Sequence, residues 1–222
     1  MDLRKDLLAL LHTFNNDTWR SSRLNCFRWI LTYFRLRLNF PFLNWLILRF
    51  SDRGMSFRFL DCEISPMYEE FCAIMDYHPS GEEFLALPPD PSSTYDALLC
   101  ESPIQIFPDS MMPHPHNIPL APFLQRAQHN DGSLQWSHCL CYLFLNVFAM
   151  VSPFDGYGDI RLLSVARQIT LGGRTPHLLI LGETMNWVYD TATRPDVTVP
   201  LRGCPILLQV FFCSFHDFCL SS

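Results

Sequence analysis

Arginine and aromatic residues alternate along the first part of the chain, a combination with the chemistry of nucleic-acid binding. Arginine side chains can hold phosphates, and aromatic rings can stack on bases. The interleaved aromatic residues are Trp19, Phe27, Trp29, Tyr33 and Phe34. The arginines that would make the contacts are Arg20, Arg23, Arg28, Arg35 and Arg37. The pattern makes these five arginines a candidate nucleic-acid interface.

The distribution of charge argues against nucleic acid as the main partner. Residues 1–58 carry ten Lys and Arg against four Asp and Glu, whereas residues 59–222 carry six against eighteen. This acidic remainder would repel a polyanion. Arg28 and Arg35 are seven residues apart, which would place them on one helical face as a solvated stripe, with the aromatic residues in a core. Both interpretations of the arginines stay open at this point.

Patterns typical of catalytic sites are missing from the sequence. It contains no Gly-x-Ser-x-Gly elbow and no Cys-plus-His signature. The acid pairs Glu69-Glu70 and Glu82-Glu83 are adjacent and diverge, so we interpret them as a helix-dipole complement and a solvated loop. Gly156-x-Gly158 and Gly172-Gly173 lack the lysine or third glycine of a phosphate-binding loop, and they predict turns and helix ends.

Metal binding is not supported by the spacing of the potential ligands. His138-Cys139-x-Cys141 places three ligand-type side chains within four residues, and His114-x-His116 lies in a proline-rich stretch. Structural zinc sites use paired Cys-x2–4-Cys or His-x3–5-His spacings. On a helix, Cys139 would point away from the other two side chains. We therefore predict core thiols beside a histidine, with no metal site and no cofactor.

The cysteines and the most apolar stretch bear on the compartment. The cysteines number nine, an odd count, and no signal peptide precedes them. These features predict a reducing, intracellular compartment and no disulfide framework. The stretch 136–154 approaches membrane-spanning length, but it contains Ser137, His138, Asn146 and Pro153. A buried core helix is favoured there over a membrane span.

Local patterns predict a mainly α-helical bundle with at most a small β-hairpin. Ser56–Leu60 alternates as a strand does, and the residues after it can complete a hairpin. Ser65 and Pro66 predict the start of a helix, with Ser65 as its cap. The apolar face of that helix would comprise Tyr68, Phe71, Cys72 and Met75. Further helices are expected over 3–13, 24–37, 41–50, 134–151, 160–169 and 206–215, and from Thr175-Pro176 onward with an apolar stripe at Leu178, Leu181, Met185 and Val188.

We expect a single domain over residues 1–222, made of four successive parts. Ten of the seventeen prolines fall between residues 79 and 122, which predicts a long connector because proline blocks both helices and strand ladders. The four parts are a basic helical part (1–54), a strand–helix motif (55–75), the Pro-rich connector (76–122) and an apolar helical core (123–222). The chain stops at Phe218-CLSS, just after the last expected helix, so we expect the domain to be truncated at its C-terminus.

Several of these segments resemble a known family. Residues 55–76 (MSFRFLDCEISPMYEEFCAIMD) are followed in order by an apolar helix over 136–151, by GDIRLLSVARQI from Gly158, by LGETMNWVYD from Leu181 and by GCPILLQVFF from Gly203. This series resembles the plant mobile domain, a transposon-associated family often labelled aminotransferase-like. The resemblance implies a transposon-derived plant protein that acts in the nucleus, in transposon silencing or genome maintenance.

The aminotransferase label can be examined directly in the sequence. Enzymes that use pyridoxal phosphate hold the cofactor on a lysine, usually in a desolvated site. The single lysine of this chain, Lys5, lies in an exposed first helical turn. We therefore reject aminotransferase activity. The leading expectation is a non-catalytic interaction module that contacts unidentified protein partners and no membrane.

Two rival functions remain at the level of sequence. One is nucleic-acid binding through the five arginines, which requires a single exposed arginine stripe. The other is an enzyme of unrecognised type, which requires several ionisable side chains to converge in one pocket near the turn at Gly156–Gly158. A solid apolar bundle with only surface charges would favour the interaction module.

Overall fold

The computed structural model describes residues 2–33, 35–78, 83–105, 116–152 and 154–220, with the backbone alone for 215–220. The chain is mostly helical, at 52%, with antiparallel sheets of three and two strands. The predicted mainly α fold with a small β element is confirmed. The second sheet, in which β4 (Asn117–Pro119) pairs with β5 (Tyr157–Asp159), was not predicted.

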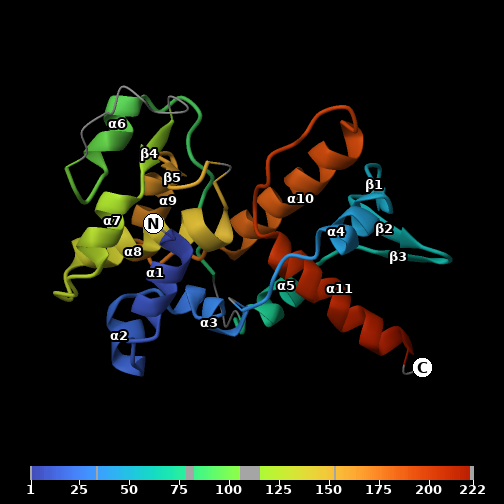
Figure 1. The fold of residues 1–222 in the computed structure, drawn as a ribbon, viewed down its shortest axis with the longest axis horizontal. Helices are drawn as coiled ribbons and strands as arrows, with labels where there is room; N and C mark the ends of the chain where they lie inside the picture. The colour runs from blue at the N-terminus through green and yellow to red at the C-terminus, as the bar shows by residue number, and fades with distance from the viewer. Residues whose placement is uncertain (1, 34, 79–82, 106–115, 153, 221–222) are drawn as a thin grey trace.

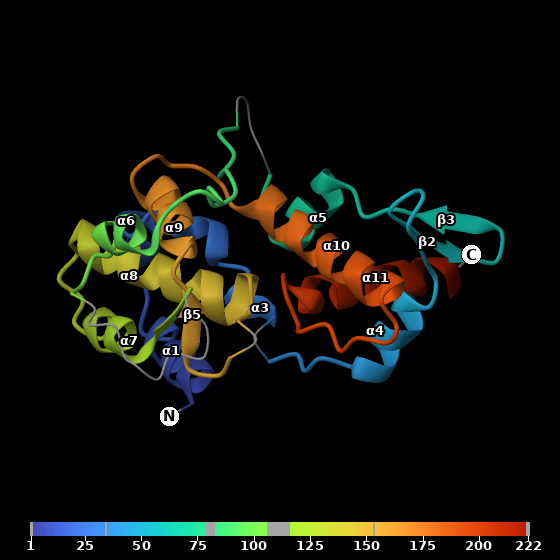
Figure 2. The same cartoon turned by 90° about the horizontal axis from the view of Figure 1, so that it is seen from above.

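The helices and strands form two lobes that lie side by side, with the N-terminus in the first lobe and the C-terminus at the far end of α11 in the second (Figures 1 and 2). Besides the β4–β5 pair, the first lobe contains α1 (Leu3–Leu11), α2 (Asn16–Ser21), η1 (Asn25–Phe27), α3 (Ile30–Tyr33), α6 (Tyr95–Cys100), α7 (Ala121–Ala127), α8 (Leu134–Phe144), η2 (Leu145–Ala149) and α9 (Leu162–Thr170). The second lobe contains α4 (Phe40–Ile47), β1 (Phe50–Ser51), β2 (Ser56–Phe59), β3 (Cys62–Ile64), α5 (Tyr68–Ile74), α10 (His177–Thr193) and α11 (Pro205–Leu220).

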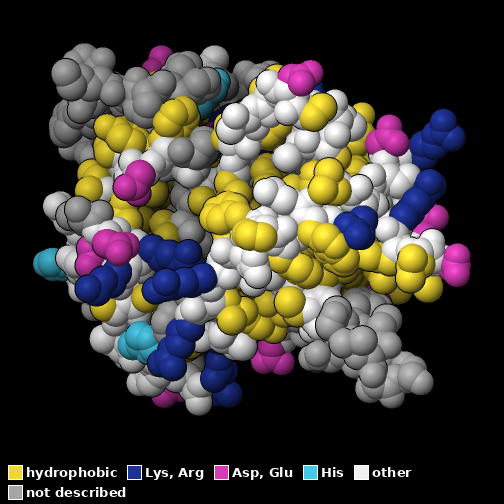
Figure 3. Space-filling view, turned by 45° about the vertical axis from the view of Figure 1, so that its right-hand side comes forward, with side chains coloured by type: hydrophobic (Ala, Val, Ile, Leu, Met, Phe, Trp, Pro, Cys, Tyr) yellow, Lys and Arg dark blue, Asp and Glu magenta, His cyan; other side chains and the backbone are white. Residues whose placement is uncertain are grey.

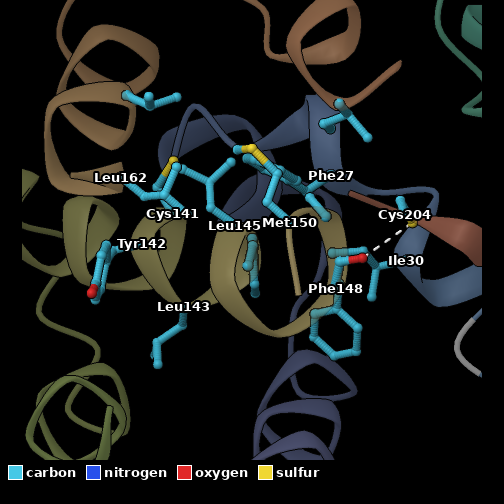
Figure 4. Close-up of a cluster of buried hydrophobic side chains, with 14 of the residues drawn as sticks. Phe27, Ile30, Cys141, Tyr142, Leu143, Leu145, Phe148, Met150, Leu162 and Cys204 are labelled. Carbon is cyan, nitrogen blue, oxygen red and sulfur yellow. Dashed lines mark hydrogen bonds between the residues drawn. The ribbon is translucent and has the colours of Figure 1, made fainter. Parts of the chain in front are cut away.

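Helix α8 forms the centre of the first lobe. Its nine residues from Trp136 to Phe144 are all buried, and the Ser133 hydroxyl caps its start by accepting the Trp136 N–H at 3.1 Å. Figure 4 shows apolar side chains of this helix among those of neighbouring elements, with the Cys204 thiol donating to the Phe148 carbonyl at 3.1 Å. The predicted buried helix is confirmed. None of the helices in the described ranges is long and apolar enough to cross a membrane.

The end of this helix widens into a π turn, η2. The Met150 N–H donates to the Leu145 carbonyl instead of to the residue four positions back. The widened turn carries the buried Asn146, whose Oδ1 accepts the backbone N–H of Asp159 in β5 at 2.7 Å. The helix predicted over 134–151 therefore starts where expected but ends at Ala149, and its last turn is not α-helical. Such π turns are frequent at functional sites.

The single helix predicted over 24–37 is wrong. The structure has η1 and the short α3 in its place, and Arg23 before them has a φ of 58°. Leu24, Phe27, Trp29 and Ile30 are all buried. At 100° per residue these four positions surround a helix instead of sharing one face, so a straight helix could not bury them all on one side. The chain turns in order to place each of them in the core.

The strand–helix motif is confirmed, although its cap differs. β2 pairs with β3 as predicted and also with β1, and Phe71, Cys72 and Met75 of the α5 face are buried. The cap residue is Met67, whose N–H donates to the Glu70 carboxylate at 3.2 Å. Ser65 was expected to cap α5, but its hydroxyl donates instead to the Met55 carbonyl at 3.3 Å. Ser65, which follows β3, thus connects the open end of the β2–β3 hairpin to the residue before β2.

The Pro-rich connector contains more structure than expected. It includes α6 and β4, and α7 begins at Ala121, inside the predicted connector. Residues 83–87 contact both lobes: the Ala86 N–H donates to the Thr175 carbonyl just before α10 at 2.8 Å, and the Leu87 N–H donates to the Gln168 side chain of α9 at 2.9 Å. The remainder of the prediction, over 79–82 and 106–115, falls outside the described residues. Proline blocks long elements but tolerates these short ones.

The predicted apolar stripe of α10 is shifted at its start. Leu181, Met185 and Val188 are buried as expected, but Leu178 is 43% exposed and His177 is buried in its place. Positions 177, 181, 185 and 188 share a face at helical spacing, so the histidine completes the stripe. The last helix, α11, begins at Pro205 as predicted and continues beyond Phe215 to Leu220.

Candidate functional site

A cleft of about 420 Å³ lies where the two lobes meet. We call it the interlobe cleft. Its apolar wall comprises Pro88, Pro89 and Pro91 of the connector, Met150, Val151 and Phe154 after the π turn, Leu162 of α9 and Leu179 of α10. Its polar lining comprises Asn117, Ser152, Asp159, Arg161, Glu183 and Arg202, with Gly203 beside them. Ionisable side chains from several elements therefore converge next to the turn at Gly156–Gly158.

Asp159 and Arg161 form the closest ion pair of the cleft. The Arg161 Nε donates to the two Asp159 carboxylate oxygens at 2.9 and 3.0 Å, and its Nη2 donates to Oδ2 at 2.5 Å. The hydrogen bonds to Asp159 raise the pKa of Arg161, and the negative charge of Glu183 adds to that shift. The amide of Asn146 fixes the Asp159 backbone from the other side. Arg161 is thus held in place with its charge matched.

Arg202 is held in the same way by a carboxylate outside the cleft. It donates to Asp190 of α10, which also forms an ion pair with Arg194 at 3.6 Å. The loop that carries Arg202 returns to α10, where the Cys204 N–H donates to the Thr184 hydroxyl at 2.8 Å. Both arginines of the cleft therefore already have an acidic partner.

Two polar groups of the lining differ from these pairs. Glu183 lines the cleft from α10 and forms no hydrogen bond or ion pair with another described side chain, although its charge acts on Arg161. Asn117 is 6% exposed, and its Nδ2 has no hydrogen-bond partner. A buried amide group without a partner costs free energy, about 1–3 kcal/mol. Glu183 is therefore a carboxylate of the lining without a hydrogen-bonded partner among the described side chains, whereas the unpaired amide nitrogen of Asn117 is enclosed by the protein.

The five arginines of the sequence prediction are all exposed, but they do not lie on one helix. Arg20 lies in the last turn of α2, Arg23 and Arg28 flank η1, and Arg35 and Arg37 follow α3. The Arg23 guanidinium donates to the Thr170 carbonyl at 3.1 Å, and that of Arg28 donates to the Asn16 side chain at 3.1 Å. The helical stripe proposed for Arg28 and Arg35 is wrong because the helix is interrupted.

The aromatic residues between these arginines mostly serve the core. Trp19, Phe27 and Trp29 are between 0% and 3% exposed. Tyr33 is half-buried, and its hydroxyl donates to the Ile74 carbonyl at 2.9 Å; Phe34 falls outside the described residues. The three buried rings cannot stack on bases. In the sequence they alternate with the arginines, but in the structure these rings lie in the core and the arginines lie at the surface. Figure 3 shows Lys and Arg side chains gathered on part of one face, without locating these five.

The residues that the sequence analysis considered for a Schiff base or a metal site lie in surroundings that fit a structural role. Lys5 is exposed on α1, as expected, and its amine is not in the desolvated setting that a Schiff-base lysine needs. His138 is buried and donates from Nε2 to the Leu163 carbonyl at 3.1 Å, while Cys139 and Cys141 are fully buried. Among the described residues, no group of three or more His, Cys, Asp and Glu side chains could hold a metal ion. The eight described cysteines are free thiols.

Glu83 is not in a solvated loop as the sequence predicted. Its carboxylate accepts hydrogen bonds from the hydroxyls of Tyr68 at 2.6 Å and Thr175 at 2.5 Å. Burial alone would raise the pKa of Glu83, but the bonds from Thr175, Tyr68 and Tyr77 and the nearby His177 lower it overall. This arrangement joins the connector to α5 and α10, and its partners point to a structural role.

Sequence reasoning did not single out any residue of the polar lining. Asn117, Asp159, Arg161, Glu183 and Arg202 come from separate strands, helices and loops, and no spacing relates them. The turn at Gly156–Gly158, named as the place where a polar cluster would need to form, was the only signal. No protein-family model, curated protein or solved structure matches this chain. The resemblance to the plant mobile domain therefore stays a prediction.

Proposed function

We propose that this chain is a non-catalytic interaction module that receives a segment of a partner protein in the interlobe cleft. The observation that carries the proposal is the composition of the cleft, which combines an apolar wall with a few polar groups. Such a combination is typical of binding sites, where the apolar surface supplies affinity and the polar groups orient the ligand. The volume of about 420 Å³ fits one or two side chains with their backbone.

The cleft also meets the condition set for an enzyme of unrecognised type, because ionisable side chains converge there. Three features support binding instead. Asp159 is paired with Arg161, and Arg202 with Asp190, so these groups are engaged with each other. The Ser152 hydroxyl, which lines the cleft, donates to the Phe154 carbonyl at 3.4 Å. Among the described residues, the lining includes no histidine or cysteine that could activate a nucleophile.

The setting of this module follows from the resemblance and from the cysteines. Free thiols support a reducing, intracellular compartment. The resemblance to the plant mobile domain supports a transposon-derived protein that works in the nucleus, in transposon silencing or genome maintenance. An interaction module suits that setting, because such complexes depend on protein contacts.

A selection of peptides from a displayed library, using the full chain as the target, tests the proposal. Selected peptides should lose binding to Leu179→Trp, because the larger ring occupies the cleft. Leu178→Trp is the matched control, since Leu178 is the neighbouring residue but is exposed and does not line the cleft. Peptides that bind both variants equally well, or a selection that yields none, would refute binding in the cleft.

The second candidate is phosphate contact by the exposed arginines. Arg20, Arg23, Arg28 and Arg37 are exposed and form no ion pair with a carboxylate among the described residues, which favours this function. Because the neighbouring rings are buried, such contact would be electrostatic, and affinity for a single-stranded oligonucleotide should fall steeply with salt. Fluorescence anisotropy at two salt concentrations measures this, and Arg20→Gln with Arg28→Gln should weaken it.

A further inference from the structure

We infer that the outer face of α4 is a docking surface for an amphipathic helix of a partner protein, with acidic residues beside the apolar face of that helix. Seven of the eight residues of α4 are apolar, and Asn44 is the exception. Leu43 and Leu46 are buried where α4 lies against α10 and α11, at the edge of the second lobe (Figure 2). A surface helix ordinarily carries polar or charged residues on its other side. Among the described residues, those that line the interlobe cleft do not include any of α4, so this surface goes beyond the proposed function.

Large apolar side chains make up the outer face. Phe40 is 57% exposed, Trp45 is 40% exposed, and Leu48, directly after the helix, is 84% exposed. At 100° per residue these three positions fall within about 140° of the helix circumference, opposite the buried side. Leu60 in the β2–β3 turn is fully exposed and extends the surface, because the ring centroids of Trp45 and the preceding Phe59 are 5.3 Å apart. Exposed apolar patches of this kind mark interaction sites.

The surface is held in place before any partner binds. The Arg49 guanidinium lies over the Trp45 ring, 4.0 Å from its centroid, and its Nη1 donates to the Trp45 carbonyl at 3.1 Å. Gln209 of α11 fixes the segment before the helix, since its side chain accepts the Asn39 N–H at 2.8 Å and donates to the Arg37 carbonyl at 3.2 Å. A surface that is already ordered loses little conformational entropy on binding.

The charges around this surface favour an acidic partner. Residues 18–51 contain six arginines and no Asp or Glu. Arg37 lies two residues before the cap of α4 and Arg49 directly follows Leu48, and neither arginine forms an ion pair with a described carboxylate. Over residues 35–61, five arginines stand against two carboxylates, Asp52 and Asp61. Acidic residues of the partner would therefore meet a local excess of positive charge.

A helix suits this surface better than other occupants do. The backbone groups of α4 are used within the helix, so an extended segment could not pair with them, whereas the side chains of a second helix can pack beside Trp45 and Leu48. A second copy of this chain would bring the arginines of both copies together. An anionic membrane would face a chain with a net charge of −6. A helix about 10–12 Å wide meets mainly the local arginines, because charges beyond about 8–10 Å are screened.

Fluorescence anisotropy with the full chain and two labelled peptides tests the inference. The probe is a helical peptide of about 18 residues, with leucine at positions i, i+3, i+4 and i+7 of each two turns and glutamate elsewhere. The control peptide keeps the leucines and replaces every glutamate with lysine. The glutamate peptide should bind about tenfold more tightly, as expected for two surface ion pairs, and the difference should shrink as salt is added.

Variants of the chain locate the binding. Leu48→Ser should weaken binding of the glutamate peptide about tenfold, because its exposed side chain would be buried by the partner. Leu171→Ser, exposed at the end of α9 in the first lobe, is the matched control and should bind like the wild type. Arg49→Gln should reduce the preference for glutamate over lysine. Leu179→Trp, which fills the interlobe cleft, should leave binding unchanged, so the two surfaces are tested separately.

Several results would overturn the inference. Equal binding of the two peptides, or binding of neither at about 1 mM, would exclude an acidic helix as the occupant. A dimer in sedimentation equilibrium that Leu48→Ser dissociates would identify a second copy of the chain instead. Flotation with phosphatidylserine vesicles that Leu48→Ser abolishes would identify a membrane surface instead.

Discussion

Gly203 is the residue that lets the loop after α10 reach the wall of the interlobe cleft. Its φ is 66°, in the left-handed region that favours glycine. A Cβ atom at this position would lie 2.5 Å from the Thr184 backbone. The close approach places the neighbouring Cys204 N–H on the Thr184 hydroxyl. Backbone freedom and the lack of a side chain are therefore both required here.

We expect Gly203→Ala to lower the free energy of unfolding by about 2–4 kcal/mol, from the left-handed backbone and the steric overlap together. Gly182→Ala is the matched control, since Gly182 lies inside α10 and a Cβ there meets nothing within 4 Å. That variant should stabilise the chain by about 0.5–1 kcal/mol, because alanine favours helix. Urea unfolding measures both. Equal effects of the two variants would show that the contact with Thr184 is not tight.

Two buried histidines make the chain sensitive to mild acid. Burial lowers the pKa values of His138 and His177 below the ordinary value of 6.5; Arg167 lowers that of His138 further, while the charge of Glu83 opposes the shift at His177. Each ring donates from Nε2 to a backbone carbonyl, of Leu163 and of Cys26 respectively, so protonation would add a proton at Nδ1.

The unfolded chain therefore binds protons at these residues at a higher pH than the folded chain does. Stability should be complete above about pH 7 and should fall as the pH drops below 6.5, by up to about 1.4 kcal/mol per pH unit for each histidine. Urea unfolding at pH 7.5 and 5.5 measures the loss, and His177→Gln should reduce it. Glu83 titrates below this window. An unchanged midpoint between the two pH values would contradict the prediction.

At the scale of elements, the main junction is the one between the connector and the second lobe. The Glu83 carboxylate accepts hydrogen bonds from Tyr68 at the start of α5 and from Thr175 just before α10, so it holds three segments together. Thr175 also exchanges backbone hydrogen bonds with Phe84 and Ala86. Neither α5 nor the connector could fix this geometry alone, because α5 has only seven residues.

Replacement of Glu83 by glutamine should weaken this junction. Gln has the same size but lacks the charge that strengthens the bonds from Tyr68 and Thr175, so we expect a loss of about 1–3 kcal/mol in the free energy of unfolding at pH 7. Glu69→Gln, exposed on α5, should change it by less than about 0.5 kcal/mol. Thermal melts followed by circular dichroism compare them. Similar values for both variants would mean that Glu83 adds little.

At the scale of the whole molecule, both lobes draw on a single hydrophobic core. The cluster of buried side chains runs from Leu3 and Leu7 of α1 through α8 to Val188 of α10 and Phe211 of α11 without a break. The aromatic pair Phe57–Phe212, with ring centroids 4.6 Å apart, ties the small sheet to α11. A continuous core couples the lobes energetically.

We therefore expect one cooperative thermal transition for the whole chain. With unfolding of all residues in one step, the heat-capacity change should be about 3 kcal/mol per kelvin. Differential scanning calorimetry gives the calorimetric and van't Hoff enthalpies, which should agree. Two separate peaks would show that the lobes unfold independently, and that the shared core is weaker than its burial indicates.

The sequence by itself determined the features that depend on neighbouring residues. The apolar run of α8, the β2–β3 alternation and the glycine stops each act within one or two turns, where local sterics and hydrogen bonds decide. For that reason the mainly α fold and most of its helices were predicted correctly. The helix predicted over 24–37 was wrong because the core requires four apolar residues in different directions, and α6 and the start of α7 were missed inside the Pro-rich connector.

Only the tertiary structure decided the interlobe cleft. Its carboxylates, arginines and amide come from positions between 117 and 203, brought together by the β4–β5 pairing, the π turn and the loop that returns to α10. No periodicity relates them, since such contacts follow from how the elements pack. The same packing buries Trp19, Phe27 and Trp29 while the arginines between residues 20 and 37 stay exposed. Burial of a tryptophan or phenylalanine side chain lowers the free energy of the folded chain, whereas exposure of the ring to water does not.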